Sequence, residues 1–552
     1  MLQRGRVRLA GLVVAALSCA LLGWGLHAGV TAQGDAEIRG WVLTEEGHPV
    51  TGATVRLQTT TNATTTAADG TFILGRLSAG VPVTVSAWSY GHYCAIARDV
   101  LPPAADVTLT LHRYQEDDNP DYVWVAPFST DPSEVTCTTC KAPLTEIWLA
   151  NDAHARSGSN ARFLSMYNGT DLTGNSVVGA SFKADFPGTA GNCATCHAAG
   201  AALDAPFTTD MNELPALDQE YGIHCDFCHK VADVYLNPST GLPYNSAPGV
   251  ISMDIRRPFE ESERFQLFFG TFDDDNVPEE DTYLPLIEQS QWCASCHQFS
   301  FWGTPIYQSF AEWLASSYPA AGIECQACHM PSDGVMTNVA PGMGGLERDP
   351  ATIHAHTMPG AASEALLQAT MAMTVTAAVT GGQLTVEVSL TNVFGGHHVP
   401  TDYPGRNMIL VLSVTDAEGH ALPQVSGPMV PNWGGTGGSE LDLAGRPGEG
   451  YAKILRDAVS GEQPVVSYWK QAFIVSDNRI AAGATNVTRY TFAIAAGACP
   501  SPLRISATLW FRRLFIEMAR DKGWDNADVL MAQQQLLVPL EGLWNRIYLP
   551  LL

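Results

Sequence analysis

Apolar and polar side chains alternate along two stretches of this chain. In residues 36–112, short alternating runs rich in Thr and Val are separated by the turn sequences Glu-Gly-His-Pro, Ala-Asp-Gly and Ser-Ala-Gly. The same period of two returns in residues 370–515, in the runs 384–390, 408–414, 489–494 and 503–509. Because successive side chains of a strand point to opposite faces, this period indicates strands with one buried face. The pattern predicts a β-sandwich in each stretch.

The middle of the chain lacks that alternation and contains only short helical pieces among many Gly and Pro residues. Such a segment is typical of a domain whose interior is filled by a cofactor rather than by side chains. The predicted fold is therefore multi-domain, with a short-helix and loop core between two β-sandwiches. The predicted boundaries are 1–33 for a signal peptide, 34–114 for the first sandwich, 120–365 for the core, 366–515 for the second sandwich and 516–552 for a helical tail.

The N-terminal segment has the features of an export signal. Arg4, Arg6 and Arg8 precede an apolar run from Leu9 to Val30, which ends in small residues. A charged region, an apolar region and a small-residue cleavage site direct export, so we expect the mature protein in the periplasm or outside the cell. The run is long for a signal peptide, and its retention as an uncleaved membrane anchor is the alternative.

Ten of the 13 cysteines occur in Cys-x-x-Cys pairs, and four of the five pairs are followed directly by His. The pairs are Cys137/Cys140, Cys193/Cys196, Cys225/Cys228, Cys293/Cys296 and Cys325/Cys328, and the last four precede His197, His229, His297 and His329. Cys-x-x-Cys-His is the attachment motif of haem c, in which two thiols on one helical turn bind the porphyrin and the imidazole binds the iron. Zinc ribbons, iron–sulfur sites and redox thiol pairs do not require that His. The sequence therefore predicts four haems c.

The remaining pair, Cys137/Cys140, is followed by Lys141. A Lys amine binds iron only when it is deprotonated, and as a weaker ligand it leaves the opposite face of a fifth haem as a substrate position. Lys141 is the one sequence indication of catalysis. Two alternatives stay open, namely an electron-transfer haem with a replaced ligand and a lapsed site without haem.

Electron-transfer haems usually have a second axial ligand, commonly His or Met. His154 is the strongest candidate, because it follows a helical stretch just after the first cysteine pair. The further candidates are His354, His356, His397, His398 and His224, with Met358 as a weaker one. Since adjacent histidines cannot bind the same iron, one of His397 and His398 is expected to be structural. For each candidate, a hydrogen-bonded buried His is the alternative.

Three segments resemble known families. Residues 38–55 with the later Ala-Asp-Gly-Thr-Phe resemble the carboxypeptidase regulatory-like β-sandwich, and residues 370–515 look like an immunoglobulin-like module. The central segment resembles multihaem c-type cytochromes, among them the tetrahaem cytochrome of ammonia oxidisers and the pentahaem ammonia-forming nitrite reductase. The residues that carry this resemblance are Trp148, the run Asp152-Ala-His154-Ala, the Gly-Ile-x-Cys contexts and the run from Cys325 to Pro331.

The resemblance to the reductases implies a role for Lys141, since that family also carries a Lys at one attachment motif. The chain departs from the family at two places: Lys230-Val-Ala-Asp233 replaces the Tyr after the third motif, and no His lies between His229 and His297. These departures argue against nitrite reduction. Electron transfer is the main hypothesis, and reduction of nitrite, hydroxylamine or sulfite at the Lys141 haem is the alternative.

The net charge of the chain limits the classes of binding partner that we expect. The 552 residues carry a formal charge of −26, so the surface repels phosphate and nucleic acid is not an expected partner. Redox donor and acceptor proteins are expected instead, and a membrane only through the N-terminal anchor. The acidic residues Asp273–Asp275, Glu279, Glu280 and Asp281 offer oxygen ligands for calcium, with a solvated loop as the alternative. A disulfide between Cys94 and Cys499 stays open.

Overall fold

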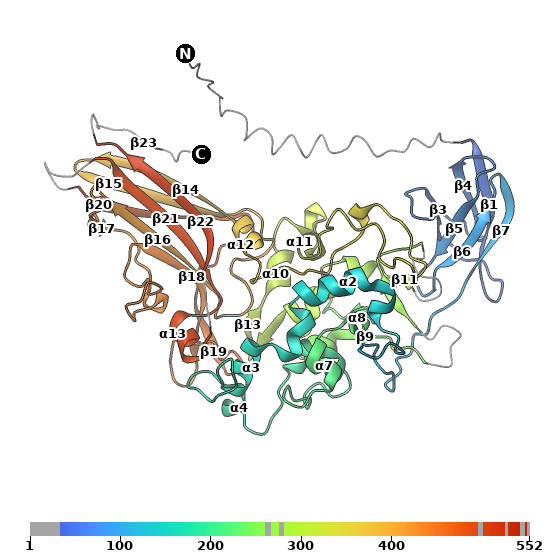
Figure 1. Cartoon of the computed structure of the whole chain (residues 1–552), viewed down its shortest axis with the longest axis horizontal. Helices are drawn as coiled ribbons and strands as arrows, with labels where there is room; N and C mark the ends of the chain where they lie inside the picture. Colours follow the sequence, from blue (N-terminus) through green and yellow to red (C-terminus); the bar gives the residue numbers. More distant parts are fainter. Residues whose placement is uncertain are drawn as a thin grey trace, which may run out of the picture. The chain divides into compact units, whose positions relative to one another are not determined.

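The computed structural model describes residues 34–259, 266–274, 281–494, 501–524, 528–540 and 547–548. The chain forms two compact units, residues 1–113 with Asp273–Asp275, and Tyr114–Phe272 with Asn276–Leu552 (Figure 1). The predicted signal peptide, residues 1–33, lies outside the described residues. In the described part of the chain, no helix has the length and apolar character needed to span a bilayer.

The first unit consists of a three-stranded sheet, β4-β1-β7, and a four-stranded sheet, β3-β2-β5-β6. The strands are β1 (Ala36–Thr44), β2 (Thr54–Leu57), β3 (Ala63–Thr65), β4 (Thr71–Leu77), β5 (Val83–Trp88), β6 (Ala95–Val100) and β7 (Ala104–Leu111). Ile38 and Val42 of β1 share one apolar core with Val55 of β2 and Val85 of β5. The alternating residues of both sheets therefore face each other, as in a sandwich.

The central part of the second unit is built from short helices and two-stranded sheets. The helices are α2 (Cys137–Asn151), η1 (His154–Ser159), α3 (Ala161–Asn168), α4 (Phe182–Asp185), α5 (Ala194–His197), α6 (Ala199–Ala202), α7 (Ala216–Tyr221), α8 (Cys225–Cys228), η2 (Gly249–Ser252), η3 (Pro285–Glu288), α9 (Gln291–His297), α10 (Ser309–Leu314), η4 (Pro319–Ala321), α11 (Cys325–His329), η5 (Pro350–Thr352) and α12 (Glu364–Thr370). The paired strands are β8 (Val231–Val234) with β9 (Met253–Ile255), β10 (Phe268–Gly270) with β11 (Asp281–Tyr283), and β12 (Phe299–Phe301) with β13 (Thr304–Tyr307).

The rest of the second unit contains two five-stranded sheets, in the orders β17-β20-β15-β14-β23 and β19-β18-β16-β21-β22. The elements are β14 (Met371–Thr380), β15 (Gln383–Asn392), β16 (Asn407–Thr415), β17 (Gln424–Ser426), η6 (Asn432–Gly434), β18 (Gly448–Asp457), β19 (Ala472–Asp477), β20 (Thr485–Ala493), β21 (Leu503–Arg512), α13 (Ile516–Asp521), β22 (Val529–Val538) and β23 (Ile547–Tyr548). Val386 of β15, Leu410 of β16 and Leu509 of β21 are fully buried in a common core. The alternating runs of the sequence coincide with strands β15, β16, β20 and β21.

The predicted helical tail over 516–552 is wrong in its main part. Helix α13 ends at Asp521, and Val529–Val538 form strand β22, which pairs with β21 from Leu503↔Val538 onward. The segment is rich in Leu, Gln, Met and Ala, which favour helices. Pairing with an already formed sheet outweighs that local preference, because each residue gains ladder hydrogen bonds and alternate side chains become buried.

Candidate haem-attachment sites

The five cysteine pairs define five sites, each carried by a short helix. We number them as site 1 (Cys137–Lys141, on α2), site 2 (Cys193–His197, on α5), site 3 (Cys225–His229, on α8), site 4 (Cys293–His297, on α9) and site 5 (Cys325–His329, on α11). Residues three and four positions apart lie on one helical face, so the helix brings the two thiols and the ligand of a motif side by side.

Site 1 departs from this regular turn directly after Cys140. The helix is kinked at the next residue, Lys141, whose φ and ψ are −114° and 37°, and Pro143 follows. A proline lacks the amide hydrogen and its ring clashes with the preceding turn, which accounts for the kink. The thiols of Cys137 and Cys140 are both partly buried. The expected attachment thiols are therefore present, but the expected regular helical turn does not continue from Cys140 to Lys141.

Three motif histidines each face a second imidazole from a distant part of the chain. His229 faces His356, with ring centroids 6.2 Å apart and planes inclined by 30°. His297 faces His154 at 6.2 Å and 85°. His329 faces His397 at 6.4 Å and 13°.

These separations match the space that one metal ion needs between two imidazoles. A metal–nitrogen bond to imidazole is about 2 Å long, and the nitrogen lies about 1 Å from the ring centroid, so two rings on one metal have centroids roughly 6 Å apart. Imidazoles in direct contact would be closer, as the stacked rings of His197 and Phe163 are at 3.8 Å. The three pairs therefore fit axial ligation of a haem iron.

Each of the six paired imidazoles has its Nδ1 hydrogen-bonded to an acceptor. The acceptors are the carbonyls of Phe269 for His229 (2.6 Å), His354 for His356 (3.2 Å), Pro359 for His329 (2.7 Å) and His398 for His397 (2.9 Å), and the carboxylates of Asp152 for His154 (2.9 Å) and Asp402 for His297 (3.3 Å). An Nδ1–H bond of this kind fixes the tautomer and leaves the Nε2 lone pair for a metal.

Burial keeps several motif and opposite imidazoles neutral. It lowers the pKa of His197 to about 4 and that of His229 to about 3. Burial also lowers the pKa of His329 and His356. The neutral imidazole is the form that binds metals, so these groups do not need to lose a proton at neutral pH before they ligate iron.

The structure distinguishes among the other histidines proposed from the sequence. The Nδ1 of His398 lies 3.5 Å from a carboxylate oxygen of Glu312, whereas the ring of its neighbour His397 faces His329. His354 has its Nδ1 2.9 Å from the carbonyl of Met330, but no imidazole of the described residues faces it as in the three pairs. The two adjacent histidines thus have different neighbours in the fold, and their division into one ligand and one structural residue stays a prediction.

Two other candidates, His224 and Met358, are not members of the facing pairs. His224 is fully buried, accepts a hydrogen bond from the Phe227 amide at 3.2 Å and has no hydrogen-bond partner for Nε2 among the described residues. Met358 has a left-handed backbone with φ of 35°. Among the described residues, the neighbours of the His224 ring are Trp124 and Phe227 and not a motif histidine.

Sites 1 and 2 have different surroundings from the three paired sites. The Lys141 ammonium lies 4.7 Å from the centroid of the Phe268 ring, which in turn stacks on His229 at 3.9 Å. At site 2, the hydroxyls of Tyr307 and Tyr468 hydrogen-bond at 2.7 Å, and both side chains interact electrostatically with the two cysteines of the site. The tyrosines were not found from the sequence, because they come from segments more than a hundred residues away.

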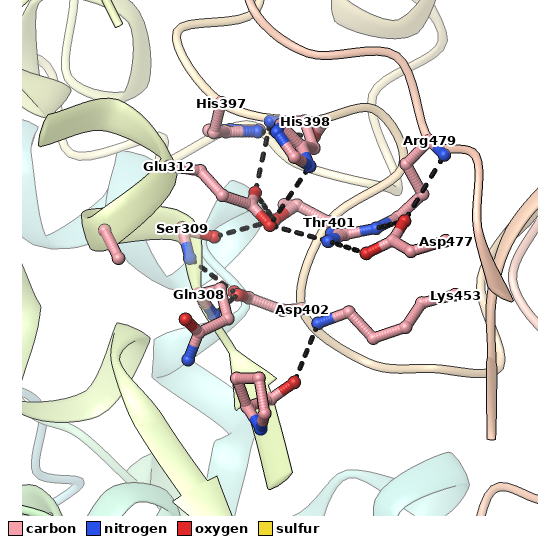
Figure 2. Close-up of polar contacts among 12 residues, drawn as sticks. Gln308, Ser309, Glu312, His397, His398, Thr401, Asp402, Lys453, Asp477 and Arg479 are labelled. Atoms are coloured by element: carbon pink, nitrogen blue, oxygen red, sulfur yellow. Dashed lines mark hydrogen bonds and ion pairs between the residues drawn. The ribbon is translucent and has the colours of Figure 1, made fainter. Parts of the chain in front are cut away.

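A loop between β15 and β16 supplies groups to two sites. It carries His397, which faces His329 of site 5, and Asp402, which bonds His297 of site 4. Glu312 of α10 holds this loop in place (Figure 2): its carboxylate accepts hydrogen bonds from the His398 amide at 3.1 Å and from the Thr401 hydroxyl at 2.8 Å. The C-terminal sandwich is thus part of the site architecture.

The carboxylate of Glu312 is balanced by a buried cation. The guanidinium of Arg479 lies 2.8 Å from Glu312 and 2.8 Å from Asp477, with side-chain exposures of 5% for Arg479 and 7% for Glu312. In the same region Lys453 donates hydrogen bonds to the carbonyls of Pro305 and Ile306. No motif marks these residues in the sequence, since the contacts join segments that are far apart.

Neighbouring sites approach one another through their sulfurs. The Cys137 thiol of site 1 interacts with Cys225 of site 3. Site 4 adjoins three others, because Cys296 interacts with Cys196 of site 2 and Cys228 of site 3, and Cys293 interacts with Cys325 of site 5. The five sites therefore form one continuous cluster with site 4 at its junction.

The remaining expectations concern calcium and a disulfide. Asp273 bonds the Arg56 guanidinium at 2.7 Å, and Asp274 accepts from the Thr59 amide at 2.6 Å. The residues that the structure describes contain no group of three or more His, Cys, Asp or Glu arranged to hold a metal ion. Asp275, Glu279 and Glu280 lie outside the described residues, as does Cys499, the proposed partner of buried Cys94.

Comparison with known proteins identifies a structural relative. No protein-family model matches the chain, and no curated protein sequence matches it. Among solved structures, the chain is similar to a penta-haem cytochrome c552 from Thermochromatium tepidum, with a TM-score of 0.52, 20% sequence identity, and coverage of 73% of this chain and 97% of that one. The chain therefore has the fold of a multihaem cytochrome c, as the sequence predicted. The resemblances of the two flanking sandwiches stay predictions.

Proposed function

We propose that this chain is an exported multihaem c-type cytochrome that binds five haems covalently and transfers electrons between a donor protein and an acceptor protein. The observation that carries the proposal is the set of three imidazole pairs with centroids 6.2–6.4 Å apart. Each pair joins a Cys-x-x-Cys-His motif to a His that the sequence does not place nearby. Chance pairing of histidines gives no reason for a separation that fits one metal ion.

The chain's residues have defined tasks in this proposal. The ten cysteines of the motifs attach the porphyrins. The irons are bound on one face by the residue that follows each motif, namely Lys141, His197, His229, His297 and His329. The opposite ligands are His356 at site 3, His154 at site 4 and His397 at site 5. Haem iron supplies the one-electron redox change, while the protein sets ligation, dielectric and access. The interactions between cysteines of neighbouring sites support a continuous path through the cluster.

Intact mass of the exported protein tests the proposal directly. We expect the mature chain to lack residues 1–33, or to retain them as an anchor, and to exceed the mass of the polypeptide by five haems. A Cys325→Ala/Cys328→Ala variant is expected to lose one haem, whereas Cys94→Ala, which changes a buried cysteine outside the motifs, loses none. A colourless protein with the mass of the bare polypeptide overturns the proposal.

The same measurement decides whether site 1 carries a haem. A Cys137→Ala/Cys140→Ala variant removes both thiols of the motif that ends in Lys141. We expect it to weigh one haem less than the wild type, as the Cys325→Ala/Cys328→Ala variant does. A wild-type protein with four haems, and a site 1 variant that also keeps four, would identify site 1 as a lapsed attachment site.

A second function is supported by site 1. Lys141 occupies the position at which the other four motifs carry His, and the helix is kinked there. We propose as the alternative that this haem reduces a small nitrogen or sulfur compound, with the other haems as its electron supply. A high-spin signal that shifts when nitrite, hydroxylamine or sulfite is added, and that is lost in Lys141→His, supports this function. A spectrum that none of the three compounds changes refutes it.

A further inference from the structure

The three facing imidazole pairs differ in the groups that accept hydrogen bonds from their Nδ1 atoms. Both rings of the site 3 pair and both rings of the site 5 pair bond backbone carbonyls. Both rings of the site 4 pair bond carboxylates, His154 to Asp152 at 2.9 Å and His297 to Asp402 at 3.3 Å. Site 4 is the one described pair with a carboxylate on each side.

Both carboxylates are buried and fixed. The Asp152 side chain is 0% exposed, and its Oδ1 also accepts from the His154 amide at 2.8 Å. The Asp402 side chain is 9% exposed, and its Oδ1 accepts from the amides of Gln308 and Ser309 at 3.0 and 3.1 Å (Figure 2). These additional bonds orient each carboxylate so that the remaining interaction is directed at the imidazole.

We propose that Asp152 and Asp402 are positioning residues that give the site 4 haem a lower reduction potential than the haems of sites 3 and 5. The inference rests on the proposed function. A carboxylate that accepts the Nδ1–H bond makes the imidazole a stronger donor to its metal, and a buried negative charge stabilises the more positive ferric state. A backbone carbonyl has the same bonding geometry but carries no net charge.

The position of site 4 makes this difference important for the whole cluster. Its cysteines interact with those of sites 2, 3 and 5. A low-potential centre at this junction is the last of the three paired sites to be reduced. Electrons then reside on the flanking sites, and the junction separates the site 5 end from the site 1 and site 3 end.

The ring planes give site 4 its own spectroscopic signature. The planes of His154 and His297 are inclined by 85°, against 30° at site 3 and 13° at site 5. Perpendicular imidazoles leave two iron d orbitals close in energy, which gives a strongly anisotropic low-spin EPR signal, whereas near-parallel imidazoles give a rhombic one. A His154→Ala variant identifies the site 4 signal by its loss.

The test is a potentiometric titration of the full-length protein, followed by EPR, for Asp402→Asn, Asp152→Asn and the double variant. Each Asn keeps the size of the side chain and removes the charge. We expect each single variant to change the ferric-to-ferrous ratio of the site 4 signal about tenfold at a fixed potential, equivalent to a rise of about 59 mV, and the double variant to change it further. Asp254→Asn, whose carboxylate bonds Arg256 rather than an imidazole, is the control and should leave the ratio unchanged.

The outcomes separate this inference from the proposed function. If all haems are bound and neither variant raises the potential of site 4, or if Asp254→Asn raises it equally, the carboxylates do not set the potential and the inference is overturned. If Asp402→Asn loses a haem because the loop is displaced, Asp152→Asn on the opposite ring decides. A protein that carries no haem contradicts the proposed function itself, which the intact mass reveals before any titration.

Discussion

Replacement of Glu312 by Gln tests whether the C-terminal sandwich holds the site 5 ligand in place. The substitution keeps the side-chain size and the acceptor oxygen, but removes the charge that faces Arg479 at 2.8 Å. Both side chains are at most 7% exposed, so water cannot replace the lost attraction. Removing one partner of a buried ion pair typically costs about 3–5 kcal/mol.

The expected cost here is somewhat smaller, because Arg479 keeps a second carboxylate, Asp477, at 2.8 Å. Gln still accepts the hydrogen bonds from Thr401 and the His398 amide, but a bond to a charged acceptor is worth about 1.5–3 kcal/mol and one to a neutral acceptor about 1 kcal/mol. We therefore expect Glu312→Gln to reduce the free energy of unfolding by about 2–3 kcal/mol.

The assay is denaturant unfolding monitored by the EPR signal of the site 5 haem, whose two imidazoles, His329 and His397, are near-parallel. This signal reports on the loop directly because His397 lies on it. The matched control is Glu517→Gln, because Glu517 is 50% exposed, bonds Arg520 at 3.2 Å and is expected to contribute less than about 1 kcal/mol. If Glu312→Gln stays within about 0.5 kcal/mol of the wild type, or destabilises the protein without lowering the midpoint at which this signal is lost, the reasoning is wrong.

Three further predictions follow from individual contacts. His397→Ala should convert one low-spin haem to a high-spin one, whereas His398→Ala should leave all haem signals in place, as an EPR spin count of both variants would establish. Burial raises the pKa of Asp218 from an ordinary 3.8 to about 6, so the folded state binds more protons than the unfolded state, and the free energy of unfolding falls as the pH rises from 4 to 6. Asp218→Asn should therefore be more stable than the wild type at pH 7 by up to about 3 kcal/mol, and equally stable at pH 3. Burial lowers the pKa of Lys453 from 10.5 to about 8, so the unfolded state binds more protons than the folded state, and the free energy of unfolding rises as the pH rises from 8 to 10.5. A Lys453→Met variant whose free energy of unfolding changes with pH as steeply as that of the wild type in this range would contradict the prediction.

The attachment motifs could be predicted from the sequence because they are local. Two thiols and a ligand within five consecutive residues need only one helical turn to come together, and a short helix carries the motif at all five sites. At site 1 that turn is interrupted between Cys140 and Lys141, and at site 3 the helix ends at Cys228, so His229 follows it as the cap residue. The alternating runs of the C-terminal sandwich were equally informative, since a period of two determines which side chains face the core. The helical tail was not predicted correctly, because residues 529–538 take their structure from the neighbouring strand β21 rather than from their own propensity.

The sequence by itself located five candidate attachment motifs, and it supplied a set of histidines for the opposite faces without pairing them. Only the tertiary structure decided that His154 faces His297, that His397 and not His398 faces His329, and that Asp402 bonds a site 4 ligand. These partners are 68 to 143 residues apart along the chain, and no local rule links them. The positions of His397 and Asp402 depend on the loop between β15 and β16, which Glu312 of α10 contacts through His398 and Thr401, and such contacts are a property of packed segments and not of any one segment.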